Sequence, residues 1–295
     1  MENLGRTQEL LQIRACLKAQ RNVLLEGPVG VGKTHLALYV TGDLKLPVFR
    51  VDGDNRYSEQ KLSGWFDPPS VIQKGFGEKS FIAGPLVDAM RQGGVLFINE
   101  LNRLPEGVQN VLLPAIDERL IVVPRLGEVK AAPGFLVIAT QNPKEFVATS
   151  HLSEAILDRF ELVVLDYQTQ EEELEIVLRR LKSFLGGGAS LKDESLLALA
   201  SVRLTRMTRS HPRVKRGASV RAALSIAELA YVLISEGMSL EKAFYEAVLL
   251  ALPTRIEIEQ EADSEQSLRQ ELESLVKQWC HETLKNSNNL AEKKN

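Results

Sequence analysis

The stretch NVLLEGPVGVGKTHLALYV, residues 22–40, decides the fold. It begins with a short apolar run that is typical of a buried β-strand, and it ends with a helical pattern. Between the two, Gly27, Gly32, Lys33 and Thr34 satisfy the spacing G-x-x-x-x-G-K-[ST]. This spacing, placed between a strand and a helix, is typical of a loop that binds nucleotide phosphates.

The residue types of this loop predict its chemistry. Glycines allow backbone N–H groups to curl around phosphate oxygens, and the helix that follows adds the positive end of its dipole. Lys33 would reach the β- and γ-phosphates, and Thr34 would be a ligand of Mg²⁺. An ordinary glycine-rich turn is the alternative, but a second, acidic strand later in the chain favours a site for ATP and Mg²⁺. The predicted nucleotide-contacting residues are Gly27, Pro28, Val29, Gly30, Val31, Gly32, Lys33, Thr34 and His35.

Short apolar runs alternate with helical patterns up to about residue 166, which is typical of a parallel sheet wrapped by helices. The runs do not alternate with polar residues, as expected for strands that are covered on both faces. A helix is expected over 108–115. The predicted strands are 22–25, 48–51, 95–98, 135–140 and 162–165. The sequence therefore predicts an α/β, P-loop nucleotide-binding core with a five-stranded parallel sheet over residues 1–166.

A small all-helical domain is predicted over residues 167–255, with no strands after Tyr167. Thr169 and Glu172 have the spacing of a capping box at the start of its first helix. That helix is expected to end at the three glycines 186–188. Further helical patterns cover 193–203, 219–235 and 239–251.

A tail is predicted over residues 256–295. It begins with an acidic stretch, 257–265, and its polar end, 286–295, is expected to fray. Between these lies an amphipathic segment that carries Leu268, Leu272, Leu275 and Trp279.

The composition excludes several classes of protein. Lys and Arg total 36 against 39 Asp and Glu, so the net charge of −3 gives no general attraction to nucleic acid or to anionic membranes. Cys16 and Cys280 are too far apart in sequence to indicate a disulfide framework or a zinc site. The N-terminus lacks an apolar signal core, and no run approaches the roughly 20 apolar residues of a membrane helix. A cytoplasmic protein without membrane insertion is expected.

The third predicted strand ends in Asn99 and Glu100, where such strands usually end in Asp-Glu. Asn99 can offer an amide oxygen to Mg²⁺ but no negative charge, so weaker retention of the metal is expected. Glu100 keeps the carboxylate that could orient and polarise the attacking water. Two hypotheses follow: a slow but working ATPase, or a site that Asn99 has inactivated.

The chain resembles the MoxR family of AAA+ ATPases, in the branch with an insertion in the second core helix, over most of its length. The similarity is carried by FIAGPLVDAMRQGGVLFINELNRLPEGVQNVLLPAIDER, residues 81–119, where the family usually has Asp-Glu-Ile-Asn-Arg. Residues 68–85 are similar to the helix insertion, and 120–134 to a hairpin before the fourth core strand. Asn99 departs from the family pattern, which puts full metal binding in question.

The resemblance also implies roles for three residues. TQNP at 140–143 is similar to the first sensor, so Asn142 would lie near the γ-phosphate; a turn-forming Asn-Pro is the alternative. LSEAILDRF, ending at Phe160, is similar to the arginine-finger segment, so Arg159 would reach a neighbouring subunit's nucleotide; otherwise Arg159 would be a surface ion-pair residue. GASVRAAL resembles the second sensor and implies a role for Arg221, although the family usually has Pro where Val220 stands.

A finger that acts in trans implies a homo-oligomeric ring, by resemblance a hexamer. The resemblance further implies a chaperone-like remodeller that matures a client protein or inserts its metal or cofactor, with a partner that has a von Willebrand factor A domain. Two rivals remain open. One is a non-hydrolysing scaffold that assembles when ATP binds, and the other is a nucleic-acid motor, suggested by six Arg and one Lys within 203–221. The absence of interleaved aromatic residues argues against the motor.

Overall fold

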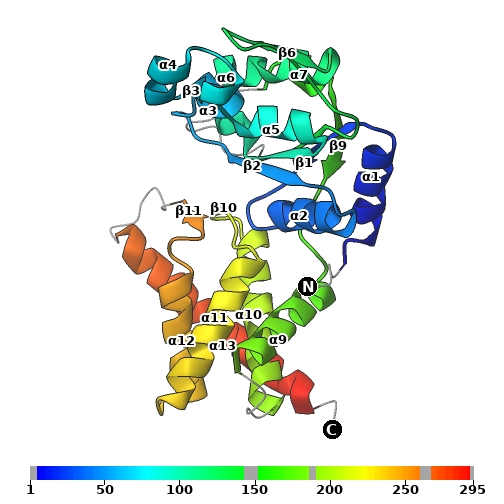
Figure 1. Cartoon of the computed structure of the whole chain (residues 1–295). Coiled ribbons are helices and arrows are strands. Elements are labelled where there is room, and N and C mark those ends of the chain that lie inside the picture. Colours follow the sequence, from blue (N-terminus) through cyan, green and yellow to red (C-terminus); the bar gives the residue numbers. More distant parts are fainter. Residues whose placement is uncertain (1–4, 143–151, 186–190, 260–266, 293–295) are drawn as a thin grey trace. The chain divides into compact units, whose positions relative to one another are not determined.

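The computed structural model describes residues 5–142, 152–185, 191–259 and 267–292. The chain divides into two compact units, Met1–Asp166 and Tyr167–Asn295, and each is described by itself. Figure 1 shows a sheet with helices on both faces in the first unit and a group of helices in the second. The three glycines 186–188, where the first helix of the second unit was predicted to end, lie outside the described residues. Most of the predicted acidic stretch, 257–265, also lies outside them.

The first unit is built on a five-stranded parallel sheet, which confirms the predicted fold class. The strand order is β2-β5-β8-β1-β9, and every neighbouring pair is parallel. The three central strands are almost wholly buried, which explains their uninterrupted apolar sequences. The strands are β1 (Asn22–Glu26), β2 (Val48–Asp52), β5 (Val95–Asn99), β8 (Leu136–Gln141) and β9 (Phe160–Val164).

Helices cover both faces of this sheet. Figure 1 shows α2 (Lys33–Asp43) on one face and α5 (Pro85–Gln92) on the other. The first helix, α1 (Thr7–Lys18), contacts β1 and β9. The remaining short helices of this unit are α3 (Glu59–Ser63), α4 (Pro68–Lys74), η1 (Glu78–Ser80), η2 (Leu101–Arg103), α6 (Glu106–Asn110), α7 (Leu112–Asp117) and α8 (Glu154–Leu157).

The single helix predicted over 108–115 is wrong, because α6 and α7 are separate helices that adjoin at Val111. Pro114 explains the break. A proline has no N–H to donate to the carbonyl four residues earlier, and its ring clashes with that carbonyl. The apolar spacing was read correctly, since Val108, Leu112 and Ala115 are all buried.

Two hairpins are attached to the core. The predicted hairpin within 120–134 is present as β6 (Leu120–Val123) and β7 (Gly127–Lys130). A second antiparallel pair joins β3 (Gly64–Phe66) to β4 (Phe81–Ala83), and β4 lies within the range 68–85 that resembles an insertion. The sequence did not predict this pair, because three-residue strands show no readable alternation.

The second unit is mainly helical, but the expectation that no strands follow Tyr167 is wrong. A short antiparallel ladder joins β10 (Val214–Arg216) to β11 (Glu257–Ile258). The predicted capping box is confirmed, since the Thr169 N–H donates to Glu172 Oε2 at 2.9 Å and the Glu172 N–H donates to Thr169 Oγ1 at 3.3 Å. The helices are α9 (Gln170–Leu185), α10 (Leu191–Ser210), α11 (Val220–Ser235), α12 (Leu240–Ala251) and α13 (Leu268–Glu292).

The last helix, α13, belongs to the core of the second unit. It remains helical to Glu292, so fraying from residue 286 is not observed in the described part of the chain. Trp279 is 2% exposed, packs in one cluster with residues of α10, α11 and α12, and meets the ring of His211 edge-on at 5.3 Å. We therefore infer that this helix stabilises the second unit.

Replacement of Trp279 by Ala is expected to lower the free energy of unfolding by about 3–5 kcal/mol, because it leaves a large cavity in the core. Denaturant unfolding followed by far-ultraviolet circular dichroism measures this change. Trp65→Ala is the matched control, since Trp65 is 43% exposed on β3. Equal effects of the two substitutions would contradict the assigned role of α13.

Candidate functional site

The glycine-rich loop connects β1 to α2, as predicted. Gly30 (φ 82°) and Gly32 (φ 93°) adopt left-handed backbone conformations that side chains disfavour. A Cβ on Gly27 would lie 2.2 Å from the carbonyl oxygen of Leu165, so this position has no room for a side chain. Lys33 lies at the start of α2, and its Nζ donates to the carbonyl oxygens of Gly27 at 2.6 Å and Pro28 at 2.9 Å. The loop is therefore curled around its own lysine.

Three polar side chains meet where α2, β5 and β8 come together. The hydroxyl of Thr34 donates to Asn99 Oδ1 at 2.8 Å, and the hydroxyl of Thr140 donates to the same oxygen at 3.1 Å. Asn99 is the last residue of β5, and Thr140 lies near the end of β8. Ligands of open parallel sheets bind at the carboxyl ends of the strands, and this cluster lies there.

Asn99 also contacts the end of β2. Its Nδ2 donates to Asp52 Oδ1 at 3.1 Å, and Asp52 and Asn99 are direct partners in the register of the two strands. Arg50 donates to both carboxylate oxygens of Asp52, with its Nε at 3.0 and 3.1 Å and its Nη2 at 2.7 Å. The pKa of Asp52 is lowered mainly by this hydrogen bond from Arg50 and further by the one from Asn99, whereas burial opposes the shift.

Glu100 follows β5 in a strained backbone conformation. Its φ of 60° and ψ of 58° are left-handed values that a residue with a side chain adopts at some cost, and such residues cluster at functional sites. Thr140 Oγ1 accepts the N–H of Glu100 at 2.9 Å. The Glu100 carboxylate is 35% exposed and pairs with Arg103 Nη1 at 2.7 Å. The predicted catalytic carboxylate is therefore partly exposed and held by an arginine three residues later.

Asn142 lies directly after β8, and its exposed fraction is only 6%. Its carbonyl oxygen accepts a bond from Asn102 Nδ2 at 3.4 Å. The structure therefore brings Asn142 to the same sheet edge as Glu100, and its role as a sensor stays a prediction. Pro143, the last residue of the predicted TQNP motif, lies outside the described residues.

Arg159 lies between α8 and β9, away from the glycine-rich loop in sequence. Its Nε donates to both oxygens of Asp117 at 2.7 Å, and Nη2 is 2.6 Å from Oδ2 of the same carboxylate. The Arg159 Nη1 also donates to the carbonyl of Ala155. The hydrogen bond with Asp117 raises the pKa of Arg159, so the guanidinium stays charged. Asp117 fixes the direction of this side chain, and the ion pair matches the alternative interpretation of Arg159 as an ion-pair residue. Its role as a finger stays a prediction.

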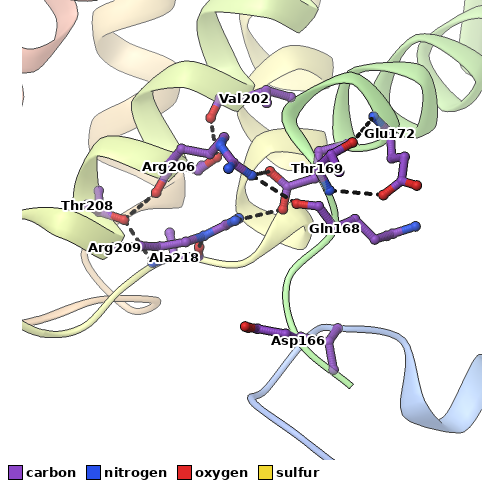
Figure 2. A network of polar contacts seen from close by, with 12 residues as sticks. Asp166, Gln168, Thr169, Glu172, Val202, Arg206, Thr208, Arg209 and Ala218 are labelled. Carbon is purple, nitrogen blue, oxygen red and sulfur yellow. Dashed lines mark hydrogen bonds and ion pairs between the residues drawn. The ribbon is translucent and has the colours of Figure 1, made fainter. Parts of the chain in front are cut away.

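Arg221 lies in the second unit, where it is exposed in the first turn of α11. Its predicted contact with nucleotide stays a prediction. Within the same basic segment, Arg206 and Arg209 form ion pairs with the buried Glu173 at 3.2 and 2.7 Å. Figure 2 shows both arginines extending from α10 toward the start of α9, where Thr169 and Glu172 form the capping box.

Two further pairs use the same segment. Arg213 pairs with Glu271 of α13, and Lys215 lies 3.0 Å from Glu259. Several of the basic residues that suggested a nucleic-acid surface are therefore neutralised inside their own unit.

The oxygen donors at the sheet edge fit a magnesium ion. Mg²⁺ prefers hard oxygen ligands and takes only one or two of them from the protein when phosphates supply others. The Thr34 hydroxyl and the Asn99 amide oxygen are 2.8 Å apart and meet this need. Within the described residues, no group of three or more His, Cys, Asp or Glu is arranged to hold a metal. No helix in that part of the chain is long and apolar enough to cross a bilayer.

Comparison with known proteins finds a family match within the first unit. Residues 22–160 match the model of the AAA domain, dynein-related subfamily. An uncharacterised protein of Staphylococcus epidermidis is 32% identical over 241 residues, which cover 80% of this chain and 86% of that protein.

Two solved structures share the fold at low sequence identity. A variant of RuvB from Thermotoga maritima is 18% identical with a TM-score of 0.57, and the match covers 84% of this chain and 71% of that one. NtrX from Brucella abortus is 16% identical with a TM-score of 0.60, and the match covers 98% of this chain and 64% of that one.

Proposed function

Because the chain belongs to the AAA domain family, whose members are P-loop ATPases, we propose that it binds ATP with Mg²⁺ and hydrolyses it. One observation carries this proposal. Thr34 of the phosphate loop, Asn99 at the end of β5 and Thr140 of β8 form a single hydrogen-bonded group, with Glu100 bonded to it through its backbone. The groups that we propose for phosphate binding, metal binding and water activation are thus neighbours at one edge of the sheet.

The roles follow from the chemistry of each group. Lys33 would exchange its bonds to loop carbonyls for bonds to the β- and γ-phosphates, which carry more negative charge. Backbone N–H groups of the loop would hold the remaining phosphate oxygens. Thr34 and Asn99 would hold Mg²⁺, which would supply positive charge to balance the phosphates. Glu100 would orient the attacking water and receive its proton, and Asn142 would hold that water or the γ-phosphate.

We extend the proposal to the protein's assembly and task. The range 68–85 that resembles an insertion and the β6–β7 hairpin support a MoxR-type remodeller. Arg159, which Asp117 fixes and whose side chain is 29% exposed, suits a finger for a neighbouring subunit. The proposed assembly is a cytoplasmic ring, by resemblance a hexamer. Its proposed client is a partner protein, such as one with a von Willebrand factor A domain. Arg221 would report the nucleotide state to the second unit.

A scaffold that binds ATP without hydrolysing it is the second candidate, favoured by the neutral Asn99 and by the ion pair that holds Glu100. A nucleic-acid motor has less support, because internal ion pairs account for several of the basic residues of 203–221.

Replacement of Lys33 by Ala tests the proposed function. We expect ATP to bind about 10- to 100-fold more weakly, since a charged hydrogen bond to phosphate is lost. Equilibrium ATP binding and phosphate release are measured at increasing Mg²⁺ and protein concentrations. Lys45→Ala is the control, because Lys45 is an exposed lysine beyond the end of α2. ATP binding without phosphate release by the native chain at every Mg²⁺ concentration would favour the scaffold.

A further inference from the structure

Asp52 has no assigned role, yet the backbone holds it against the proposed metal site. The N–H of Gly53 donates to the carbonyl oxygen of Asn99 at 2.7 Å, which extends the β2–β5 pairing by one residue. A Cβ on Gly53 would lie 2.1 Å from the carbonyl oxygen of Glu100, so only glycine allows this approach. The close backbone contact places the Asp52 carboxylate 3.1 Å from the Asn99 amide nitrogen.

This contact decides which way the Asn99 amide faces. An ionised carboxylate only accepts hydrogen bonds, so the amide NH₂ group must face Asp52. The amide oxygen must then face the hydroxyls of Thr34 and Thr140, as the hydrogen bonds show. Without Asp52, either end of the amide could face the two threonines, because a hydroxyl both donates and accepts. Only one of these two orientations presents an oxygen ligand beside Thr34.

Asp52 also brings a negative charge to within one hydrogen bond of Asn99. Arg50 balances part of that charge, but its three contacts fix the carboxylate in place while Oδ1 still accepts from Asn99. The polarised amide offers a more negative oxygen than an isolated amide would. The Asp52 carboxylate, bonded to the neutral Asn99 amide, thus orients the ligand oxygen and adds negative charge near it. An Asp at position 99 would bring both directly.

We propose that Asp52 is a positioning residue for Mg²⁺: through its hydrogen bond to Asn99 it aims the amide oxygen at the metal site and partly replaces the missing charge. This inference rests on the proposed function, because it concerns the metal that accompanies ATP. It explains how a strand that ends in Asn99 can retain a working site. The family motif at the end of β5 does not include this residue, which comes from the neighbouring strand.

The test compares ATP binding to the full chain in Mg²⁺ and in EDTA, so that the ratio of the two dissociation constants reports metal coupling without any turnover. The ratio is the dissociation constant in EDTA divided by the one in Mg²⁺. For Asp52→Asn we expect this ratio to fall about tenfold, as is typical when a group that orients a metal ligand is removed. ATP binding in EDTA should be unchanged. Asp54→Asn is the matched control, since this substitution removes the same charge two residues later. The Asp54 carboxylate accepts a hydrogen bond from the Arg56 N–H, not from Asn99.

A double variant separates orientation from folding. Asp52→Asn combined with Asn99→Asp exchanges the two groups and keeps one carboxylate in the pair, so the coupling ratio should return to the native value or exceed it. Mn²⁺ binding in the presence of ATP, followed by electron paramagnetic resonance, should rank the variants in the same order.

The outcomes distinguish the inference from the function on which it rests. An unchanged ratio in Asp52→Asn, or an equal fall in Asp54→Asn, would overturn the role of Asp52 while the nucleotide site stands. A native chain that binds no ATP in either condition would overturn the proposed function itself.

Discussion

Glu100→Gln is expected to reduce phosphate release by about 10²- to 10⁴-fold, the usual contribution of a positioned general base. Glutamine has nearly the same shape but cannot take a proton from water at neutral pH. The strained backbone at Glu100 and its N–H bond to Thr140 should persist, because both belong to the main chain. ATP binding should therefore remain within a few-fold of the native value.

Single-turnover phosphate release from bound ATP measures the chemical step, and equilibrium binding measures affinity. Glu106→Gln is the matched control, since Glu106 is an exposed carboxylate in the first turn of α6. A second variant, Arg103→Ala, removes the ion pair to Glu100. If that ion pair restrains the carboxylate, phosphate release should rise in Arg103→Ala. Native-like turnover by Glu100→Gln would remove Glu100 from the proposed mechanism.

Much of the first unit could be predicted from the sequence because its signals are strong and local. The strands are short apolar runs, and all five were found within one or two residues of their observed bounds. Only the three central strands are covered on both faces as expected, because β2 and β9 lie at the edges of the sheet and are partly exposed. The failures are physical too. The ladders β3–β4 and β10–β11 have only two or three residues per strand, so their pairing depends on tertiary contacts. Pro114 broke a helix whose apolar spacing looked continuous.

The candidate site likewise has residues that the sequence predicts and residues that only the structure reveals. A motif identified Lys33 and Thr34, and the polar end of the third strand suggested that Asn99 would share Mg²⁺ with Thr34. In the structure the Thr34 hydroxyl donates to Asn99 Oδ1. The role of Asp52 depends on the register of β2 against β5, and a sequence does not supply that register. Its only signal was an acidic residue at the carboxyl end of another strand. The Asp117 partner of Arg159 is 42 residues away in sequence and had no signal at all.

Arg159→Ala is expected to reduce phosphate release by about 10³-fold or more, because an arginine finger stabilises charge that develops on the transferred phosphoryl group. The affinity of Arg159→Ala subunits for ATP should be unchanged. Asp117→Asn should lower turnover less, since it loosens the guanidinium without removing it. Arg14→Ala is the matched control, because Arg14 is a half-exposed arginine of the same unit, paired with Asp43 at 2.7 Å. Phosphate release at saturating ATP is the measurement.

A mixing experiment decides whether Arg159 acts on its own nucleotide or on a neighbour's. Lys33→Ala subunits hold ATP weakly but keep Arg159, whereas Arg159→Ala subunits hold ATP but lack the guanidinium. If the finger acts in trans, mixing the two inactive proteins should restore part of the native turnover, because some interfaces then combine an intact loop with an intact finger. Activity should also rise faster than linearly with native protein concentration. A mixture as inactive as its components, with oligomers still formed, would mean that Arg159 serves its own subunit or only its ion pair with Asp117.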